Sequence, residues 1–361
     1  MKKTLFFSLF LVSLLFISPI LSAQKTPKNV IFLIGDGMGL AQVYAGMVAN
    51  GNSLALERCT YTGFSKTYSS SNFTTDSGAG GTALACGVKT KNGMIGMSPD
   101  SVAVESILQA SSRHGLATGV VVACALTHAT PASFVAHQVN RGMNDEIAAD
   151  YLNTDIDVFI GGGRKYFEKR VDNRNLTEEL KAKNYQMAYT LDEVKAIKTG
   201  KLAGLLYDDQ NPSMPERGAM LPDATVAAID ILEHNGKGFF LMVEGSQIDW
   251  ACHDNNADQE ILEMLDFDQT VGRALDYAKR TGNTLVVVTA DHETGGLSIL
   301  DGKFGDHKMK TGFSTKSHSG VPVPVFAFGP GAENFTGFME NTSFKAKLEK
   351  LLKLKKYATA N

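Results

Sequence analysis

One short stretch of the sequence, FTTDSGAGGTALACG at residues 73–87, places an acid and a hydroxyl, Asp76 and Ser77, directly before a run of small residues. If a helix begins here, its first N–H groups and the positive end of its dipole favour an anion beside the serine. Successive glycines cost helix stability, so we interpret the small side chains as room for that anion. The stretch therefore predicts an anion site rather than an ordinary helix cap.

A second set of polar side chains follows directly after apolar runs such as NVIFLIG, TGVVVACAL, FFLMV and TLVVVTA. The set consists of Asp36, Thr127, His128, Thr130, Glu244, Asp291 and His292. In α/β sheets, ligands bind outside the carboxyl ends of strands. Any one of these residues alone would indicate a cap or a solvated loop, whereas four strands that deliver such groups to one edge predict a shared site.

The segment EGSQIDWACHDNN adds a third group, because Asp249 and His253 are four residues apart and one helical turn places them on the same face. Carboxylate oxygen and imidazole nitrogen are ligands that suit zinc. His318 in KSHSG is a candidate further ligand. The glycines on either side of Asp36, in GDGMG, lack the spacing of a dinucleotide-binding loop, and we interpret them as allowing a metal to approach Asp36.

The elements that must position these groups are short β-branched runs alternating with helical patterns, which is typical of a mostly parallel sheet covered on both faces. Helices are predicted over residues 101–115, 223–236 and 256–280, with Gly282 as a helix stop. Residues 200–221, which include YDDQNPSMPERG, are predicted to form a surface loop. The predicted fold class is α/β, with a large central sheet, helices on both faces, and a single domain over residues 24–361.

The composition limits where the chain works and what it binds. Residues 1–23 have a charged start, an apolar run and a small-residue end at Ala23, which predicts a cleaved signal peptide and a periplasmic or secreted protein. An uncleaved membrane anchor is the alternative; no membrane association is expected after cleavage. With 35 Lys+Arg against 38 Asp+Glu and a net charge of −3, the chain shows no nucleic-acid-binding block.

The four cysteines, Cys59, Cys86, Cys124 and Cys252, form no CxxC pair. Export would permit disulfides, and their pairing stays open, although Cys86 and Cys124 lie in apolar surroundings that favour buried free thiols. The remaining histidines are expected to have structural roles; they are His114, His137, His234 and His307.

Seven blocks of the sequence together resemble those of the alkaline phosphatases. They are NVIFLIGDGMG, TTDSGAGGTA, THATPASFVAHQVNR, DVFIGGGRKYF, VEGSQIDWACH, VVVTADHETGG and KSHSGVPVPVFAFGPGA. The blocks occur in the family's order and extend over residues 29–331. The resemblance therefore covers nearly the whole mature chain, and it implies the three-layer fold of that family.

The resemblance implies a role for each matched residue. Ser77 is the expected nucleophile, Arg141 the expected ligand of two phosphate oxygens, and Asp76 the group that holds Arg141. One zinc is expected on Asp249, His253 and His318, and a second on Asp36, Ser77, Asp291 and His292. A third site, usually magnesium, is expected on Asp36, Thr130 and Glu244. The implied cofactors are two Zn²⁺ and one Mg²⁺ per chain.

Two departures from the family pattern bear on these expectations. His128 and Trp250 stand where the best-known bacterial members have an acid and a lysine, a pairing similar to that of some cold-active members. A histidine there favours zinc or weakens magnesium at the third site, and His128 is a candidate additional ligand of that site. Trp250 is expected to lie near the substrate. Only a short segment separates His292 from His318, so a large insertion seen in some relatives is expected to be absent, and a homodimer is plausible.

The function that the resemblance implies is metal-dependent hydrolysis of small phosphate monoesters to an alcohol and inorganic phosphate through a covalent phosphoserine. A sulfatase would need a C-x-P-x-R motif, which none of the four cysteines provides. A phosphodiesterase or another hydrolase of the superfamily is the alternative, although a diester has one fewer charged oxygen for Arg141 to stabilise. A non-catalytic metal- or phosphate-binding relative would be expected to lack at least one ligand or the serine.

Overall fold

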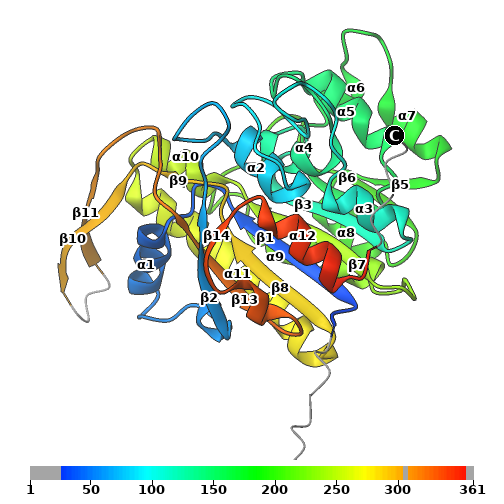
Figure 1. The fold of residues 1–361 in the computed structure, drawn as a ribbon. Coiled ribbons are helices and arrows are strands. Elements are labelled where there is room, and N and C mark those ends of the chain that lie inside the picture. Colours follow the sequence, from blue (N-terminus) through cyan, green and yellow to red (C-terminus); the bar gives the residue numbers. More distant parts are fainter. Residues whose placement is uncertain (1–25, 304–307, 355–361) are drawn as a thin grey trace, which may run out of the picture.

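A ten-stranded sheet runs through the middle of the molecule, as the computed structural model of residues 26–303 and 308–354 shows (Figure 1). Its strands, in spatial order, are β14 (Gly337–Glu340), β2 (Tyr61–Lys66), β13 (Val323–Phe328), β8 (Thr284–Thr289), β1 (Asn29–Gly35), β7 (Phe239–Gly245), β3 (Ala117–Ala125), β4 (Val158–Gly162), β6 (Lys201–Leu205) and β5 (Tyr185–Ala188). All neighbouring pairs are parallel except those of β13, which runs antiparallel to β2 and β8. The predicted mostly parallel α/β sheet is confirmed.

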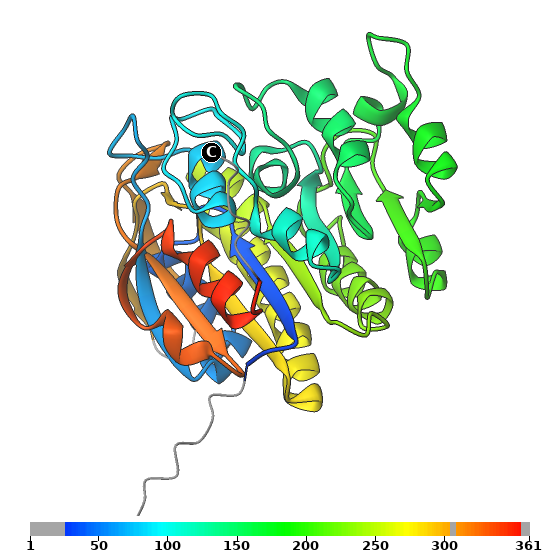
Figure 2. The same ribbon diagram turned by 45° about the vertical axis from the view of Figure 1, so that its right-hand side comes forward.

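Helices cover both faces of this sheet (Figure 2). One face carries α2 (Ser77–Cys86), α3 (Ile107–Arg113), α4 (Ala129–Val135), α5 (Asn144–Asn153), α7 (Leu176–Ala182) and α12 (Ser343–Leu351). The other carries α1 (Leu40–Ala49), α8 (Leu191–Ala196), α9 (Met220–Leu232), α10 (Gln247–His253) and α11 (Ala257–Thr281). Side chains alternate along β1, so Phe32 packs into the first layer and Leu33 into the second.

The small elements lie at the edges. The short helix α6 (Lys165–Glu168) and the 3₁₀ turns at Ala55–Arg58 and Ala332–Phe335 connect larger elements. Strands β9 (Glu293–Thr294) and β12 (His318–Ser319) pair with each other, and between them β10 (Leu297–Lys303) and β11 (Lys308–Phe313) form a hairpin. This hairpin lies beside α1 (Figure 1). It fills the short segment between His292 and His318.

Two predicted helices differ from the observed ones in their ends. Helix α3 begins only at Ile107, because Ser106 and Gln109 form a reciprocal capping box that fixes its start. Helix α9 ends at Leu232, where a turn closed by the bond from Asn235 N–H to the Leu232 carbonyl interrupts it before Gly236. Helix α11 ends as predicted, with Gly282 in the left-handed conformation at φ +66°.

The prediction of a surface loop over residues 200–221 is wrong in part. Residues Lys201–Leu205 form strand β6, and the rest of the segment is tied into the protein through a buried arginine. The Arg217 guanidinium binds Glu263 at 2.5 Å and Asp266 at 2.8 Å, and all three side chains are at most 2% exposed. Charged residues in a loop are usually solvated, so the sequence favoured a position on the surface. Instead, the ion pairs of Arg217 with α11 hold this part of the segment in the interior.

Three other predictions concern the leader, the cysteines and membrane association. The leader at residues 1–23 and His307 lie outside the described residues. All four cysteines are free thiols, with Cys86 and Cys124 buried as predicted. Among the described residues, no helix is both long and apolar enough to cross a membrane.

Replacing Arg217 by alanine is expected to lower the free energy of unfolding by about 3–5 kcal/mol, because Glu263 and Asp266 would stay buried without their cation. Urea unfolding followed by circular dichroism measures this change. The matched control is Arg58→Ala, which breaks an exposed pair with Asp276 and should cost less than about 1 kcal/mol. Equal effects of the two substitutions would contradict the role of Arg217 as a buried anchor.

Candidate metal centre and active site

The acids predicted at the strand ends lie on neighbouring strands, because β8, β1, β7 and β3 are adjacent in the sheet. Asp36 follows β1, Glu244 lies near the end of β7, and Asp291 and His292 follow β8. These four side chains are 0–1% exposed. The sheet therefore brings acidic and imidazole groups from distant parts of the sequence into one buried cluster.

His253 and His318 turn their Nε2 atoms towards the same point beside Asp249. The Nδ1 atom of His253 lies 2.6 Å from the Lys316 carbonyl oxygen, and that of His318 lies 2.8 Å from the Thr75 carbonyl. A carbonyl only accepts, so each Nδ1 carries a proton and each Nε2 faces inward. The two Nε2 atoms are 3.1 Å apart and lie 3.3 and 3.5 Å from Asp249 Oδ1. Backbone carbonyls that orient histidines in this way are typical of metal sites.

His292 is oriented by a hydroxyl instead. Thr294 Oγ1 donates to Asp249 Oδ1 and accepts from His292 Nδ1 at 3.2 Å, which leaves the Nε2 of His292 as an acceptor. That Nε2 lies 3.5 Å from Asp36 Oδ1 and 3.2 Å from Asp291 Oδ2. Three acceptors that face one another repel unless a cation lies between them. The donor atoms of Asp36, Asp249 and His292 lie within 4.8 Å of one another, close enough to share one ion.

The electrostatics of the cluster favour the same conclusion. Burial, together with the charge of Asp291, raises the pKa of Asp36, and burial with the charge of Asp249 raises the pKa of Asp291 to about 8. Burial also raises the pKa of Glu244 to about 7. For Asp249, burial raises the pKa, but the hydrogen bond from His253 and the nearby histidines outweigh it and lower the pKa.

Several buried acceptor atoms of the cluster have no hydrogen-bond partner, among them Asp36 Oδ1, Asp291 Oδ2, Glu244 Oε1 and His128 Nδ1. Burial lowers the pKa of His128 to about 4, so its ring is neutral near pH 7 and its nitrogen lone pair is free to bind a metal. Buried polar atoms are normally paired. Unpartnered oxygen and nitrogen donors with these contacts fit divalent cations, as their residue types predict.

Ser77 is the first residue of α2, next to the cluster. Asp76 caps the helix, with its Oδ1 accepting from Ala79 N at 2.9 Å, so the N-cap is the acid and not the serine. Ser77 Oγ lies 3.2 Å from His292 Nε2. The other oxygen of Asp76 accepts from Arg141 Nη1 at 3.0 Å, as the resemblance implied. A helix N-terminus, a hydroxyl and a guanidinium therefore meet at one point.

The glycines of α2 and those beside Asp36 also have a packing role, which the sequence did not indicate. A Cβ on Gly80 would lie 3.0 Å from the Asp291 carbonyl oxygen, and one on Gly81 would lie 2.9 Å from Ser133 Oγ. Gly37, at φ +73°, would meet the Asp249 Cα at 2.8 Å. These glycines therefore let protein segments pack closely around the site, a role that the sequence interpretation did not include.

The third predicted group lies at the end of β3. Thr130 Oγ1 donates to Asp36 Oδ2 at 3.2 Å, and Cys124, His128 and Glu244 offer donor atoms within 4.8 Å of one another. Sequence reasoning missed Cys124 at this site because it treated the residue as a core thiol. Its only signal was its place four residues before His128.

Trp250 packs against His128 of this third group and does not line the hollow that lies over Ser77. Its ring lies edge-on to the ring of His128, with centroids 5.7 Å apart. The hollow has a volume of about 520 Å³. It is lined by Asn72, Thr74, Thr75, Asp76, Ser77, Asn92, Arg141, Asp249, His253, Ser317 and His318. Ser77, Arg141 and the pair His253 and His318 thus open to the same space. Sequence reasoning also missed Thr294, which contacts Asp249 and His292.

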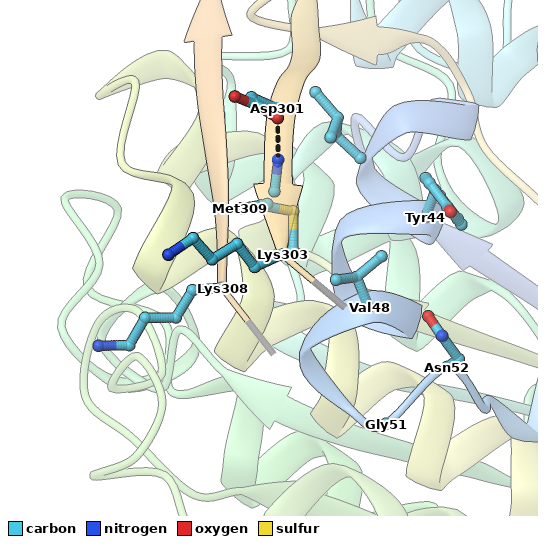
Figure 3. A pocket seen from close by; sticks show the side chains of 10 residues that line it. Tyr44, Val48, Gly51, Asn52, Asp301, Lys303, Lys308 and Met309 are labelled. Carbon is cyan, nitrogen blue, oxygen red and sulfur yellow. Dashed lines mark hydrogen bonds between the residues drawn. The ribbon is translucent and has the colours of Figure 1, made fainter. Parts of the chain in front are cut away.

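A separate hollow lies between α1 and the β10–β11 hairpin, away from these groups (Figure 3). Tyr44 and Val48 line one side, and Lys303, Lys308 and Met309 line the other. None of the predicted site residues lines it.

His137 bonds the Gly96 carbonyl at 2.7 Å and Gln109 at 2.9 Å, which agrees with its predicted structural role.

Comparison with known proteins gives consistent matches. The family model described as alkaline phosphatase matches residues 27–310 and 299–354. The chain belongs to the alkaline phosphatase family. Alkaline phosphatase 4 of Bacillus subtilis is 34% identical over 422 aligned positions, with 92% of this chain and 91% of the relative covered. The alkaline phosphatase of Escherichia coli is 32% identical, covering 92% and 88%.

Among solved structures, the alkaline phosphatase of the Antarctic bacterium TAB5 is 43% identical, with a TM-score of 0.88 and coverage of 92% of this chain and 100% of that one. Two variants of that enzyme, in which a histidine is replaced by aspartate or glutamate, are described with magnesium bound in the M3 site. The alkaline phosphatase identity and fold establish the activity of the chain as hydrolysis of phosphate monoesters.

Without metal, this alkaline phosphatase is expected to lose stability as the pH rises from 6.5 to 8.5. The pKa of Asp291 is about 8 and that of Glu244 about 7 in the folded chain, well above ordinary carboxyl values. The folded state therefore holds more protons than the unfolded state, and that stability is lost as the pH rises through these values. Thermal unfolding of chelator-treated protein should show a fall of roughly 2 °C or more.

The control for this measurement is Asp291→Asn, whose amide cannot ionise. Chelator-treated Asp291→Asn protein should show a shallower fall over the same pH range. A melting temperature that rises between pH 6.5 and 8.5 in the unsubstituted protein, or an identical profile in the variant, would contradict the assignment.

Proposed function

We propose that the chain binds two zinc ions and a third divalent cation and hydrolyses phosphate monoesters through a phosphoserine at Ser77. The first zinc is assigned to Asp249, His253 and His318. The second is assigned to Asp36, Asp291 and His292 together with the Ser77 hydroxyl. The observation that carries the proposal is the convergence of three imidazole Nε2 atoms and buried carboxylates beside Ser77 Oγ.

In the proposed reaction, a bond forms between Ser77 Oγ and phosphorus as the bond from phosphorus to the ester oxygen breaks. The hydroxyl of Ser77 loses its proton in this step, and the ester oxygen gains one as the alcohol leaves. A water oxygen then bonds to phosphorus and loses a proton, the bond to Ser77 breaks, Ser77 Oγ gains a proton, and inorganic phosphate leaves. When bound, the two zinc ions supply the Lewis acidity that lowers the pKa values of a hydroxyl and a water. Ser77 needs such activation, because a free serine hydroxyl is a weak nucleophile at neutral pH.

Arg141 is proposed to hold the non-bridging oxygens of the phosphate. Its guanidinium donates to Asp76 Oδ2, which also accepts from Gly93 N at 3.0 Å. Asp76 is therefore fixed by the helix start and by the backbone, and it holds the arginine at the rim of the hollow. A planar guanidinium donates two parallel hydrogen bonds to a phosphate, which a lysine does not.

The third cation is assigned to Asp36, Thr130 and Glu244, with His128 beside them. Support for a cation here comes from the unpartnered Glu244 Oε1 and from the variants of the Antarctic enzyme that hold magnesium in their M3 site. Hard oxygen ligands suit magnesium, whereas an imidazole suits zinc. Magnesium and zinc are both retained as candidates for this position. Trp250, packed on His128, is proposed to act near the substrate only through that ring.

The cellular setting belongs to the same proposal. Removal of residues 1–23 as a signal peptide would place a single catalytic domain, residues 24–361, in the periplasm or outside the cell. A homodimer is proposed from the family alone. The alignment with the Bacillus subtilis relative spans 422 positions, more than the 361 residues of this chain, so some positions of the relative have no counterpart here. This supports the prediction that this chain has only small insertions.

Ser77→Ala is expected to lower kcat for p-nitrophenyl phosphate by roughly 10³-fold or more, because the variant has no oxygen to attack phosphorus. Quenching the unsubstituted enzyme in acid during turnover should trap phosphate on Ser77, detectable by mass spectrometry. Ser111→Ala is the control, since the Ser111 hydroxyl donates only to its own helix. Bis-p-nitrophenyl phosphate turned over faster than the monoester would favour the phosphodiesterase alternative.

Arg141→Lys is expected to lower kcat/KM for p-nitrophenyl phosphate by roughly 10- to 100-fold, because one charge-assisted hydrogen bond is worth about 1.5–3 kcal/mol. Inhibition by inorganic phosphate should weaken in parallel, which a general loss of structure would not produce selectively. Arg174→Lys, at an exposed pair with Glu179, should leave both quantities unchanged. Unaltered phosphate inhibition in Arg141→Lys would remove Arg141 from the phosphate site.

A further inference from the structure

Cys124 lies at the end of β3, where a thiol, an imidazole and a carboxylate meet. Its Sγ is 3.3 Å from Glu244 Oε2, and donor atoms of Cys124, His128 and Glu244 all lie within 4.8 Å of one another. Cys124 and Glu244 are both 0% exposed. In this trio, His128 Nδ1 and Glu244 Oε1 are buried without a hydrogen-bond partner. Two independent unpartnered donors thus accompany the thiol.

We propose that Cys124 is a ligand of the third metal site and that its sulfur strengthens the preference of this site for zinc over magnesium. The inference rests on the proposed function, which places a cation beside Glu244. It adds a sulfur ligand to that position, and with it a definite choice of metal.

The donor types decide between the two metals. Magnesium takes oxygen ligands in near-octahedral geometry and usually keeps several waters, so a thiol and an imidazole contribute little to holding it. Zinc takes sulfur, nitrogen and carboxylate oxygen in a tetrahedral set. Cys124, His128 and Glu244 supply one of each, which leaves a fourth position for one further oxygen donor. Asp36 and Thr130 are the nearby candidates.

The fold holds the end of β3 in a particular irregular conformation. The pairing of β3 with β4 shifts register between Val121 and Ala125, which is the signature of a bulge. Two loop residues pin this stretch: Gln210 Oε1 accepts from Ala125 N at 2.7 Å, and Asn211 Nδ2 donates to the Val122 carbonyl at 3.2 Å. The position of Cys124 is therefore set on both sides by backbone contacts.

The simpler alternative is that Cys124 is an inert core thiol that donates to Glu244 Oε2 or to the Ala125 carbonyl oxygen, each of which lies 3.3 Å from its Sγ. In that case Asp36, Thr130 and Glu244 would hold magnesium through oxygen atoms alone. This alternative leaves the Nδ1 of His128 buried and unpartnered. The two interpretations differ in one measurable respect, which is whether sulfur contacts a metal.

Cobalt substitution tests this contact. Metal-free protein reconstituted with three equivalents of Co²⁺ is expected to show a near-ultraviolet charge-transfer band from thiolate to cobalt. Cys124→Ser should lose the band and Cys86→Ser should keep it, because Cys86 is equally buried but lies at the end of α2 against the Ser133 carbonyl. Three bound Co²⁺ without the band, only two bound Co²⁺, or a band that persists in Cys124→Ser would overturn the proposal.

A second measurement needs no variant, in case Cys124→Ser does not fold. Zinc-edge X-ray absorption of the three-zinc enzyme should detect a sulfur scatterer at about 2.3 Å from zinc, averaging one sulfur for every three zinc ions. Absence of sulfur would refute the proposal. If Cys124→Ser folds, magnesium should displace its third zinc at a concentration roughly tenfold or more below that needed for the unsubstituted enzyme.

The same samples separate this inference from the proposed function. Hydrolysis of p-nitrophenyl phosphate and trapping of phosphate on Ser77 report on the proposed function alone, whereas the cobalt band and the zinc–sulfur distance do not depend on turnover. An active enzyme without zinc–sulfur contact would refute only the role of Cys124. A zinc–sulfur contact in a protein that forms no phosphoserine would refute only the proposed function.

Discussion

The structure is organised around mutual repulsion among buried carboxylates. Asp36, Glu244, Asp249 and Asp291 are 0–4% exposed, and the charge of one carboxylate raises the pKa of the next. Burying several negative charges together is unfavourable unless cations lie between them. The fold keeps these acids in place at the ends of three adjacent strands, β8, β1 and β7, and on helix α10. The free energy that they cost the metal-free chain is therefore available to drive metal binding.

The histidines around these acids are held by contacts that leave their Nε2 atoms facing inward. Two carbonyl oxygens, of Lys316 and Thr75, and one hydroxyl, of Thr294, each fix an Nδ1 proton. Thr75 directly precedes Asp76 at the start of α2. The segment that orients His318 is therefore continuous with the one that carries Ser77, which couples the position of the Ser77 hydroxyl to that of the His318 ring.

The sequence was sufficient to predict the sheet and the gathering of charged residues at one edge of it. Parallel strands with apolar runs have one geometry, and charged residues directly after them can reach only one edge. Thr294 and Cys124 were missed because a hydroxyl and a thiol have common structural roles, and only their three-dimensional neighbours distinguish them. The buried Arg217 was missed for the opposite reason, because its partners Glu263 and Asp266 lie almost 50 residues away on α11.

The glycines of α2 have a packing role that the sequence did not indicate. They were interpreted as space for an anion, yet a Cβ on Gly80 would press on the Asp291 carbonyl oxygen. Close packing brings the N-terminus of α2 against the segment after β8, and this contact places Ser77 Oγ 3.2 Å from His292 Nε2. The glycines thus position Ser77, because the absence of a Cβ lets the two backbones approach each other closely. The anion site proposed at the N-terminus of α2 depends on that approach, because a bulkier helix would stand away from the segment after β8 and move the Ser77 hydroxyl away from His292.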